Sequence, residues 1–532
     1  MEALYKRYPN LWDNLVWLLW AVGYSLCFPV YNATPLIWIV FIPVLVYAYR
    51  MPFHKTVRYA FLYGLVFWWL TLFWLVAFHE ASLPFFSPGY SLYFAFFFFF
   101  IAYYSKKVGK FRWIIFPLFW VSVELLRSVG YLGFQWNLVG NVLWRNPVLL
   151  QSADIWGVWG VSFIILLVNG VLAEVVDKWI DDGNIIDAIK KKKAPVIICV
   201  SVFVFNLVYG VITYNYYKNM SENAPKEKLA LMQPNIGSHD PWWARRWENY
   251  AMIWKLHADA MTYQPDMIVW SETMVRNYIW HYRELYHPDS EVNRFNERIL
   301  NLPFEFDVPI LLTHPEVRDG KTYNSATYID PEIGEYEFYG KIHLVPFGEW
   351  MPYYQKIPVV REVLRQAGAA AYSPGEEFKI FQSRRARFAV LICFEDVFGV
   401  LARRFVLNGA NYFLNTTNDG WAYRWQVGTQ LPLWQHVAAV VPVAVSVRRP
   451  IARAVNTGVT GVFDLNGDMS ISPVPLYERG VFVDEISIID DSVRSIYVRF
   501  GFMFPYIVFF ISFAIMAYTV LLHKDKAKQG DL

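Results

Sequence analysis

The pattern of apolar and polar positions divides the chain into three regions. Long apolar runs fill residues 1–217 and 498–532, whereas residues 218–497 alternate short apolar runs with charged and turn-forming residues. Long runs are typical of membrane-spanning helices, and short runs with polar breaks are typical of a water-exposed folded domain. The pattern therefore predicts a membrane domain at 1–217, an extramembrane domain at 218–497, and a final span with its tail at 498–532.

Eight apolar segments predict transmembrane helices. A helix needs about 20 mainly apolar residues to cross a hydrocarbon core of about 30 Å. The candidates are residues 11–30, 35–49, 58–78, 88–104, 113–129, 154–176, 195–216 and 499–522. The fifth ends near Glu124 and Arg127, which we expect to face protein or the interface because charges are costly in lipid. No small-residue cleavage site follows the first segment, so we interpret it as a retained anchor.

The distribution of lysine and arginine predicts the orientation. The loops after the second, fourth and sixth spans and the tail after the eighth are basic, and the loops after the first and third contain no Lys or Arg. Basic loops stay on the cytoplasmic side of a membrane. Both termini are therefore predicted in the cytoplasm, and the central domain outside it. In a bacterium this is a multi-pass inner-membrane protein with a periplasmic domain.

The central region has the pattern of a layered α/β domain. Helical stretches, such as Trp247–Tyr263 and Glu291–Leu302, separate short apolar runs typical of strands. The predicted strands are Leu229–Pro234, Met267–Trp270, Pro309–Thr313, Ser325–Tyr328, Phe388–Cys393, Tyr412–Asn415, Val441–Val447 and Thr460–Phe463. Strands interleaved with helices favour an α/β architecture.

The composition limits the kinds of ligand and partner that we expect. The net charge of +3 is small and gives no reason to expect a nucleic-acid partner. Of the three cysteines, Cys27 and Cys199 lie in apolar runs, and Cys393 stands alone in the central region. The sequence has neither the ligand spacing of a zinc site nor a phosphate-binding glycine loop, so we expect no metal and no cofactor.

Three segments place reactive side chains just after apolar strands. Glu272 follows Met267–Trp270, Cys393 follows a strand that begins at Phe388, and Lys341 and Glu349 flank a Pro-Phe-Gly turn. Taken singly, Glu272 also fits a helix cap, the other two charges fit a solvated surface, and Cys393 fits an inert buried thiol. Taken together, Glu, Lys and Cys at strand ends indicate covalent acyl chemistry.

Each side chain then has a predicted role. Cys393 is the nucleophile, Glu272 removes its proton, and Lys341 stabilises the thiolate and the oxyanion. The backbone N–H of Phe394 is a second oxyanion donor at a strand-to-helix turn. His343 and His436 remain alternative bases.

These residues resemble the nitrilase superfamily, in which a Glu-Lys-Cys set lies on an αββα sandwich. Together with seven spans before the domain and one after it, the chain resembles the apolipoprotein N-acyltransferase family over nearly its whole length. Further matching segments are Gln233–Ile236, Tyr323–Ser325, Pro346–Glu349, Thr417–Asp419, Gln435–His436, Asn456–Thr460, Glu124–Ser128 and Gly133–Trp136. The chain departs from the family pattern at Gln135, at Phe394, and in the uncharged stretch Val437–Val447.

The resemblance implies further site residues and a reaction. Glu349 would assist catalysis, and Trp242, Phe394 and Glu395 would bind substrate. A phospholipid would donate an acyl chain to the nucleophilic cysteine, and the N-terminal amine of a diacylglyceryl-cysteine apolipoprotein would accept it from the thioester. We expect a monomer, with two aromatic-rich segments, Pro241–Trp247 and Trp350–Tyr354, as candidate lids or ordinary core.

Two other functions use the same observations. A membrane-tethered amidase or hydrolase of the nitrilase type would share the Glu-Lys-Cys set and pass its acyl group to water. A transporter or lipid-binding protein would carry an inactive nitrilase-like domain. The intact Glu272, Lys341 and Cys393 argue against the inactive domain, and no pair of interrupted spans with intramembrane charges indicates a transport path.

Overall fold

The computed structural model of the protein describes residues 9–77, 80–130, 133–237, 240–334, 336–346, 348–350, 372–424 and 430–528. Its backbone contacts form two compact units. A helical unit comprises Met1–Thr213, Val427–Pro442 and Phe500–Leu532, and a sheet unit comprises Tyr214–Gln426 and Val443–Arg499. The segment Val427–Pro442, which the sequence pattern places within 218–497, therefore groups with the helices.

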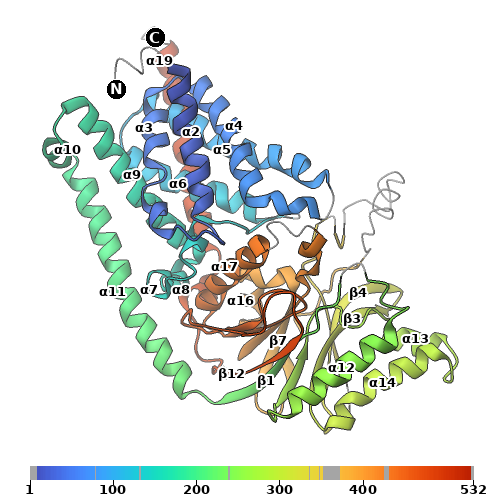
Figure 1. The fold of residues 1–532 in the computed structure, drawn as a ribbon. Coiled ribbons are helices and arrows are strands. Elements are labelled where there is room, and N and C mark those ends of the chain that lie inside the picture. The colour runs from blue at the N-terminus through green and yellow to red at the C-terminus, as the bar shows by residue number, and fades with distance from the viewer. Residues whose placement is uncertain are drawn as a thin grey trace. The chain divides into compact units, whose positions relative to one another are not determined.

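Every predicted span overlaps a helix. The helices are α2 (Pro9–Leu26), η1 with α3 (Thr34–Trp38 and Ile42–Arg50), α4 (Phe53–Leu72), α5 (Ser82–Lys107), α6 (Arg112–Ser128), α9 (Val158–Asp182), α11 (Lys193–Asn223) and α19 (Met503–Lys528). Within the helical unit α4 packs against α5, and α6 packs against both α9 and α19 (Figure 1). The α-helical membrane domain predicted from the apolar runs is thus present as a bundle.

Within the part of the chain that the structure describes, six helices are long and apolar enough to cross a membrane. They are Phe53–Ala77, Ser82–Lys107, Val158–Asp182, Lys193–Asn223, Gln430–Val447 and Met503–Leu521. Five of these coincide with predicted spans. The remaining three predicted spans form helices that are shorter or less apolar, and the second is split between a 3-10 turn and a short α-helix.

The sixth apolar helix, α17 (Gln430–Val447), corrects one prediction. We expected Val441–Val447 to be a strand, and it is the C-terminal part of this helix. A short, wholly apolar run has no periodicity to separate a buried strand from a buried helix, and α17 is 89% buried along its length. The true strand, β9 (Ile451–Val455), was missed because Arg453 interrupts its apolar pattern.

A glutamine anchors the first part of α17 in the helical unit. The Gln435 side-chain oxygen accepts hydrogen bonds from the indole N–H groups of Trp74 (3.0 Å) and Trp136 (2.8 Å), and its amide donates to the carbonyl of Thr71 (3.0 Å). Buried amides are stable when their donors and acceptors are paired. The helix therefore begins in the helical unit and ends in the sheet unit.

The two charges of the fifth span face protein, as predicted. Glu124 and Arg127 are buried. The Glu124 carboxylate accepts from the backbone N–H of Val139 (2.8 Å), and the Arg127 guanidinium donates to the carbonyl oxygens of Trp136 (2.6 Å) and Asn137 (3.3 Å). Both side chains hold the segment that follows α6 and avoid lipid.

The sheet unit contains two six-stranded sheets. The first has the order β12-β1-β2-β3-β4-β5 and the second β11-β10-β9-β8-β7-β6. The strands are β1 (Lys226–Gln233), β2 (Met267–Trp270), β3 (Ile310–Arg318), β4 (Lys321–Ile329), β5 (Tyr336–Gly340), β6 (Phe381–Gln382), β7 (Arg387–Ile392), β8 (Tyr412–Thr417), β9, β10 (Gly461–Phe463), β11 (Met469–Ile471) and β12 (Gly480–Ser487). Strands β1, β2 and β3 of the first sheet and β7, β8 and β9 of the second are parallel to one another, and every other pair of neighbours is antiparallel.

The sheets pack face to face, with helices on their outer faces. Strands β1 and β2 of one sheet contact β8 and β9 of the other. Helices α12 (Arg246–Met261) and α14 (Glu291–Phe306) lie side by side on the first sheet (Figure 1). All four residues of β2 are buried, because one set of alternate side chains packs on these helices and the other faces the second sheet. This is the predicted αββα sandwich.

Candidate functional site

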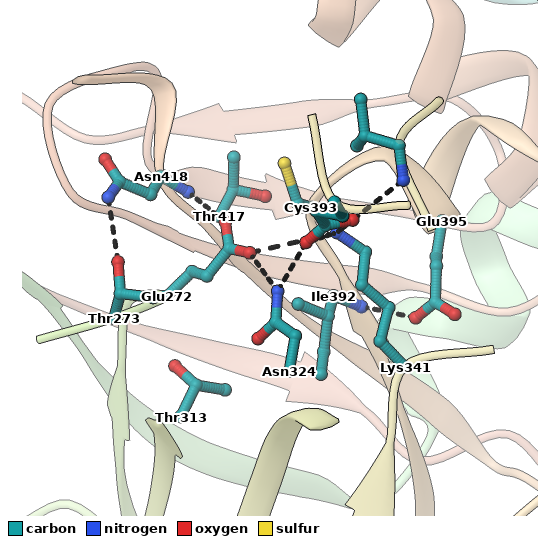
Figure 2. Close-up of polar contacts among 12 residues, drawn as sticks. Glu272, Thr273, Thr313, Asn324, Lys341, Ile392, Cys393, Glu395, Thr417 and Asn418 are labelled. Atoms are coloured by element: carbon teal, nitrogen blue, oxygen red, sulfur yellow. Dashed lines mark hydrogen bonds and ion pairs between the residues drawn. The ribbon is translucent and has the colours of Figure 1, made fainter. Parts of the chain in front are cut away.

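The sandwich brings Glu272, Lys341 and Cys393 together from three strand ends. Glu272 follows β2, Lys341 follows β5, and Cys393 follows β7. Figure 2 shows their side chains converging on one region, with the Lys341 ammonium nitrogen 3.8 Å from a Glu272 carboxylate oxygen. Strand ends hold side chains rigidly, which suits a site whose geometry must be accurate.

Glu272 is held by one hydrogen bond to each carboxylate oxygen. One oxygen accepts from the Asn324 side-chain amide (2.8 Å), and the other accepts from the backbone N–H of Asn418 (2.9 Å). Burial raises the pKa of Glu272. The ammonium of Lys341 opposes this shift and the carboxylate of Glu349 adds to it, so the net shift is upward. A carboxylate with a raised pKa is a stronger base than a free one.

Lys341 is a fully buried cation between two carboxylates. Its nitrogen lies 2.8 Å from a Glu349 oxygen, and Glu349 also accepts from the Asn324 amide (2.7 Å) and from the backbone N–H of Val345 (2.7 Å). Burial alone would lower the pKa of Lys341, but Glu349 and Glu272 outweigh burial and raise it. The lysine is therefore charged, and Glu349 fixes its direction.

Cys393 opens a 3-10 turn, η5 (Cys393–Val397), with its backbone in the left-handed region at a φ of +53°. Few residues with a β-carbon adopt this conformation, and those that do cluster at functional sites. Burial raises the pKa of the thiol well above its usual value, Glu272 raises it further, and Lys341 lowers it. The resting thiol is therefore protonated.

Glu395, predicted to bind substrate, holds the turn that begins at Cys393 in the structure, and its role toward substrate stays a prediction. It is fully buried. Its two oxygens accept hydrogen bonds from the backbone N–H groups of Ile342 (2.8 Å), His343 (2.9 Å) and Ile392 (2.8 Å) and from the hydroxyl of Tyr339 (2.9 Å). These four donors come from the segment around Lys341 and from the end of β7. Its carboxylate ties the turn after β7 to the segment that follows Lys341.

Trp242, predicted to bind substrate, lies in the hydrophobic core. Its side chain is 4% exposed, and its indole N–H donates to the carbonyl of Met274 (3.0 Å). Its ring packs on those of Trp243 and Phe295, with centroids 6.3 and 5.6 Å away. The structure therefore gives this tryptophan a packing role beneath α12 and α14.

The ring of Phe394, the residue after Cys393, and the ring of His343 both pack on Phe398. The Phe394 ring centroid is 5.0 Å from that of Phe398, and the His343 ring centroid is 3.9 Å from Phe398. Burial and the charge of Lys341 lower the pKa of His343 to about 4, so its imidazole is neutral. His436 belongs to the helical unit. The roles of Phe394 as an oxyanion donor and of either histidine as a base stay predictions.

Two asparagines of the site were not among the predicted site residues. Asn324 bridges Glu272 and Glu349 through one amide nitrogen, and Asn418 orients Glu272 and also donates from its side chain to Thr273 (2.9 Å). Asn418 directly follows β8, whereas Asn324 lies within β4. The position of Asn418 after an apolar strand is the local signal that could have identified it, and Asn324 has no such signal.

Two further points concern ligands and lids. Within the described ranges no group of three or more His, Cys, Asp or Glu side chains is placed to hold a metal ion. Of the second candidate lid, Trp350 is described, and residues 351–354 lie outside the described residues.

Two family models match the chain. An apolipoprotein N-acyltransferase N-terminal domain matches residues 20–171, and a carbon-nitrogen hydrolase domain matches residues 228–490. Among solved structures, an amidase from Nesterenkonia sp. is 17% identical, with 51% of this chain and 95% of the amidase covered at a TM-score of 0.37. The carbon-nitrogen hydrolase match agrees with the two-sheet architecture of the sheet unit.

Whole-length relatives bear the same name. An apolipoprotein N-acyltransferase from Geobacter metallireducens is 30% identical over 93% of this chain and 92% of its own length. Apolipoprotein N-acyltransferase 1 from Treponema denticola is 27% identical over 87% of this chain and 89% of its own length. With both domains matched and the Glu-Lys-Cys set assembled, the chain belongs to the apolipoprotein N-acyltransferase family.

Proposed function

We propose that this membrane-embedded lipoprotein N-acyltransferase takes its acyl chain from a phospholipid and carries it as a thioester on Cys393. The observation that carries the proposal is the convergence of a protonated thiol, a carboxylate and a buried ammonium group. Their contacts match the needs of acyl transfer, in which a nucleophile, a base and a cation act on one carbonyl group.

In the first half-reaction Glu272 accepts the thiol proton as the Cys393 sulfur attacks an ester carbonyl of the phospholipid. The Lys341 ammonium and the backbone N–H of Phe394 stabilise the oxyanion that forms. The tetrahedral intermediate collapses, the carbon–oxygen bond to glycerol breaks, and Glu272 returns the proton to the departing oxygen. A lysophospholipid leaves, and the acyl chain remains on sulfur.

In the second half-reaction the α-amine of a diacylglyceryl-cysteine attacks the thioester carbonyl. Glu272, again a carboxylate, accepts a proton from the amine and passes it to the departing sulfur, so the resting thiol is restored. Throughout, Glu349 and Asn324 hold Lys341 and Glu272 in place. The product is an amide at the amino terminus of the lipoprotein.

We also propose the location and the assembly. The alternation of basic loops supports a bacterial inner-membrane enzyme with cytoplasmic termini and a periplasmic catalytic domain. Both substrates are anchored by acyl chains, since each buried methylene contributes about 0.8 kcal/mol, so the enzyme has to meet them at the membrane surface. One chain supplies Glu272, Lys341 and Cys393, which supports a monomer as the active form.

Intact-protein mass spectrometry tests the proposal. The protein incubated with a labelled phospholipid should gain one acyl group on Cys393, and Cys393→Ala should gain none. Cys199→Ala, which alters a thiol in α11, is the matched control and should be labelled as the unaltered protein is. Labelling of Cys393→Ala at another residue would refute the nucleophile. Ammonia release from a small amide, without transfer to a lipopeptide amine, would favour the hydrolase instead.

A further inference from the structure

A fully buried arginine lies between the two loops that carry the nucleophile and support the base. Arg453, in β9, is 0% exposed. Its Nε lies 3.4 Å from an Asp396 carboxylate oxygen, and its Nη2 lies 3.3 Å from an Asp419 carboxylate oxygen. Both carboxylates are buried as well. One planar cation therefore joins two acidic residues from different loops.

The Nε side of the Arg453 guanidinium is linked to Cys393, the proposed nucleophile. The Nε of Arg453 donates to the side-chain oxygen of Asn415 (3.1 Å), and the Asn415 amide donates to the carbonyl of Cys393 (3.2 Å). Asp396, in η5, is three residues beyond Cys393. The guanidinium thus restrains the turn that presents the thiol through the Asn415 amide at Cys393, and its charge lies beside the Asp396 carboxylate.

The Nη2 side of the Arg453 guanidinium is linked to Glu272, the proposed base. Asp419 directly follows Asn418, whose backbone N–H donates to Glu272 (2.9 Å). The side chain of Asn418 accepts from Asn456 (2.9 Å), which is three residues beyond Arg453. The end of β9 therefore supports the loop that orients the general base.

We propose that Arg453 is a positioning residue that sets the separation between the Cys393 thiol and the Glu272 carboxylate. The proposal rests on the function proposed above. An arginine fork has fixed donor directions, so Arg453 defines the distance between the Asn415 and Asp419 side chains to which it donates. Buried ion pairs contribute little net stability, because the cost of desolvation offsets their attraction. Stability alone therefore does not explain why an arginine is buried at position 453. A misplacement of about 1 Å can slow a reaction about 100-fold.

A second buried arginine provides a matched control. Arg449 is also 0% exposed, but its guanidinium donates to backbone carbonyl oxygens, including those of Ala410 (2.7 Å) and Val493 (2.9 Å). Arg453→Lys and Arg449→Lys therefore remove the same fork from equally buried sites, and only the first site joins the two catalytic loops.

The test compares two reactions of Cys393 in the full-length protein. One is single-turnover thioester formation from phospholipid, and the other is alkylation by iodoacetamide as a function of pH, which needs no lipid. We expect Arg453→Lys to form thioester about 100-fold more slowly at saturating phospholipid, with its half-saturating concentration unchanged. At lower pH its alkylation rate should fall below that of the unaltered protein, because Glu272 no longer assists removal of the thiol proton. Arg449→Lys should match the unaltered protein in both reactions.

The remaining outcomes are decisive. Unchanged rates in a folded Arg453→Lys, or equal losses in Arg449→Lys, overturn the proposal. If Arg453→Lys does not fold, the neutral triple variant Arg453→Met, Asp396→Asn and Asp419→Asn replaces it, with the same expected losses. If neither folds, the role is structural and the proposal is overturned. If the unaltered protein forms no thioester but the alkylation profiles still differ, the acyl-transfer proposal fails and the positioning role stands.

Discussion

Two buried glutamates of the sheet unit, Glu272 and Glu395, differ in their hydrogen-bond partners. Each oxygen of Glu272 accepts one hydrogen bond, and the Lys341 ammonium lies 3.8 Å away. The oxygens of Glu395 accept from four donors, three backbone N–H groups and the Tyr339 hydroxyl. These donors join the end of β7 to the segment around Lys341, whereas Glu272 lies beside the Lys341 ammonium. The difference leads us to expect a reactive role for Glu272 and a structural role for Glu395.

The largest effect is expected when the Lys341 cation is removed from the candidate site. Lys341→Met should slow thioester formation at least about 10³-fold, because oxyanion stabilisation is lost and two buried carboxylates face each other without a counter-charge. Lys379→Met is the matched control, since Lys379 pairs with Glu337 (2.7 Å) at a partly exposed site. Rapid-quench mass spectrometry measures the rates. A loss below about tenfold would mean that Lys341 is not the oxyanion partner.

A smaller effect is expected from neutralising Glu272, the proposed base. Glu272→Gln should slow thioester formation about 10²- to 10³-fold, because the amide cannot accept the thiol proton. In the unaltered protein the rate should fall as the pH falls through the raised pKa of Glu272, since only the carboxylate is a base. The residual rate of the variant should lack this acid limb. If its pH profile keeps the limb, another group is the base.

The smallest effect concerns the structural carboxylate. Glu395→Gln should lower the free energy of unfolding by about 2 kcal/mol at low pH, because the amide places two N–H hydrogens where the protonated acid places one O–H hydrogen, and these face backbone donors that cannot rotate. Glu227→Gln is the control, since Glu227 accepts from the hydroxyls of Tyr412 (2.7 Å) and Ser383 (3.0 Å), which can reorient. Thermal unfolding in detergent compares the variants. Equal losses would show that the fixed donors are not what distinguishes Glu395.

The same variant makes a pH prediction. Burial raises the pKa of Glu395 from 4.5 to about 7. The folded protein therefore keeps this proton up to about pH 7 while the unfolded chain releases it near pH 4.5, so stability falls as the pH rises across that window. The loss is roughly 3 kcal/mol. This part of the slope should be absent from Glu395→Gln, and an identical slope in both proteins would contradict the shifted pKa.

Local sequence patterns predicted the helices and strands better than they predicted the contacts between these elements. The apolar runs predicted the helices of the bundle, and the strand ends predicted Glu272, Lys341 and Cys393, which the fold brings together. The roles of these residues stay predictions. Trp242 and Glu395 were assigned to substrate from resemblance, and only their surroundings in the fold show a core residue and a carboxylate held by backbone N–H groups.

The residues that were missed owe their places to long-range pairing. Asn324, Asn418 and Arg453 act through partners that are distant in sequence, and no local period marks such contacts. The run Val441–Val447 was misassigned because its uniform apolarity fits a strand and a buried helix equally well. Sequence periodicity describes which side of an element is buried, and it contains no information about which polar groups meet there.

The membership of α17 in both units has a consequence for biogenesis. The indole donors of Trp74 and Trp136 find their acceptor in Gln435, which the ribosome adds about three hundred residues later than the second of them. The bundle therefore cannot complete its packing during insertion of its early spans. A nascent chain halted before Val427 would lack the acceptor that Gln435 provides to both indole groups. Completion of the helical unit is thereby coupled to synthesis of most of the sheet unit, which precedes Val427 in the sequence.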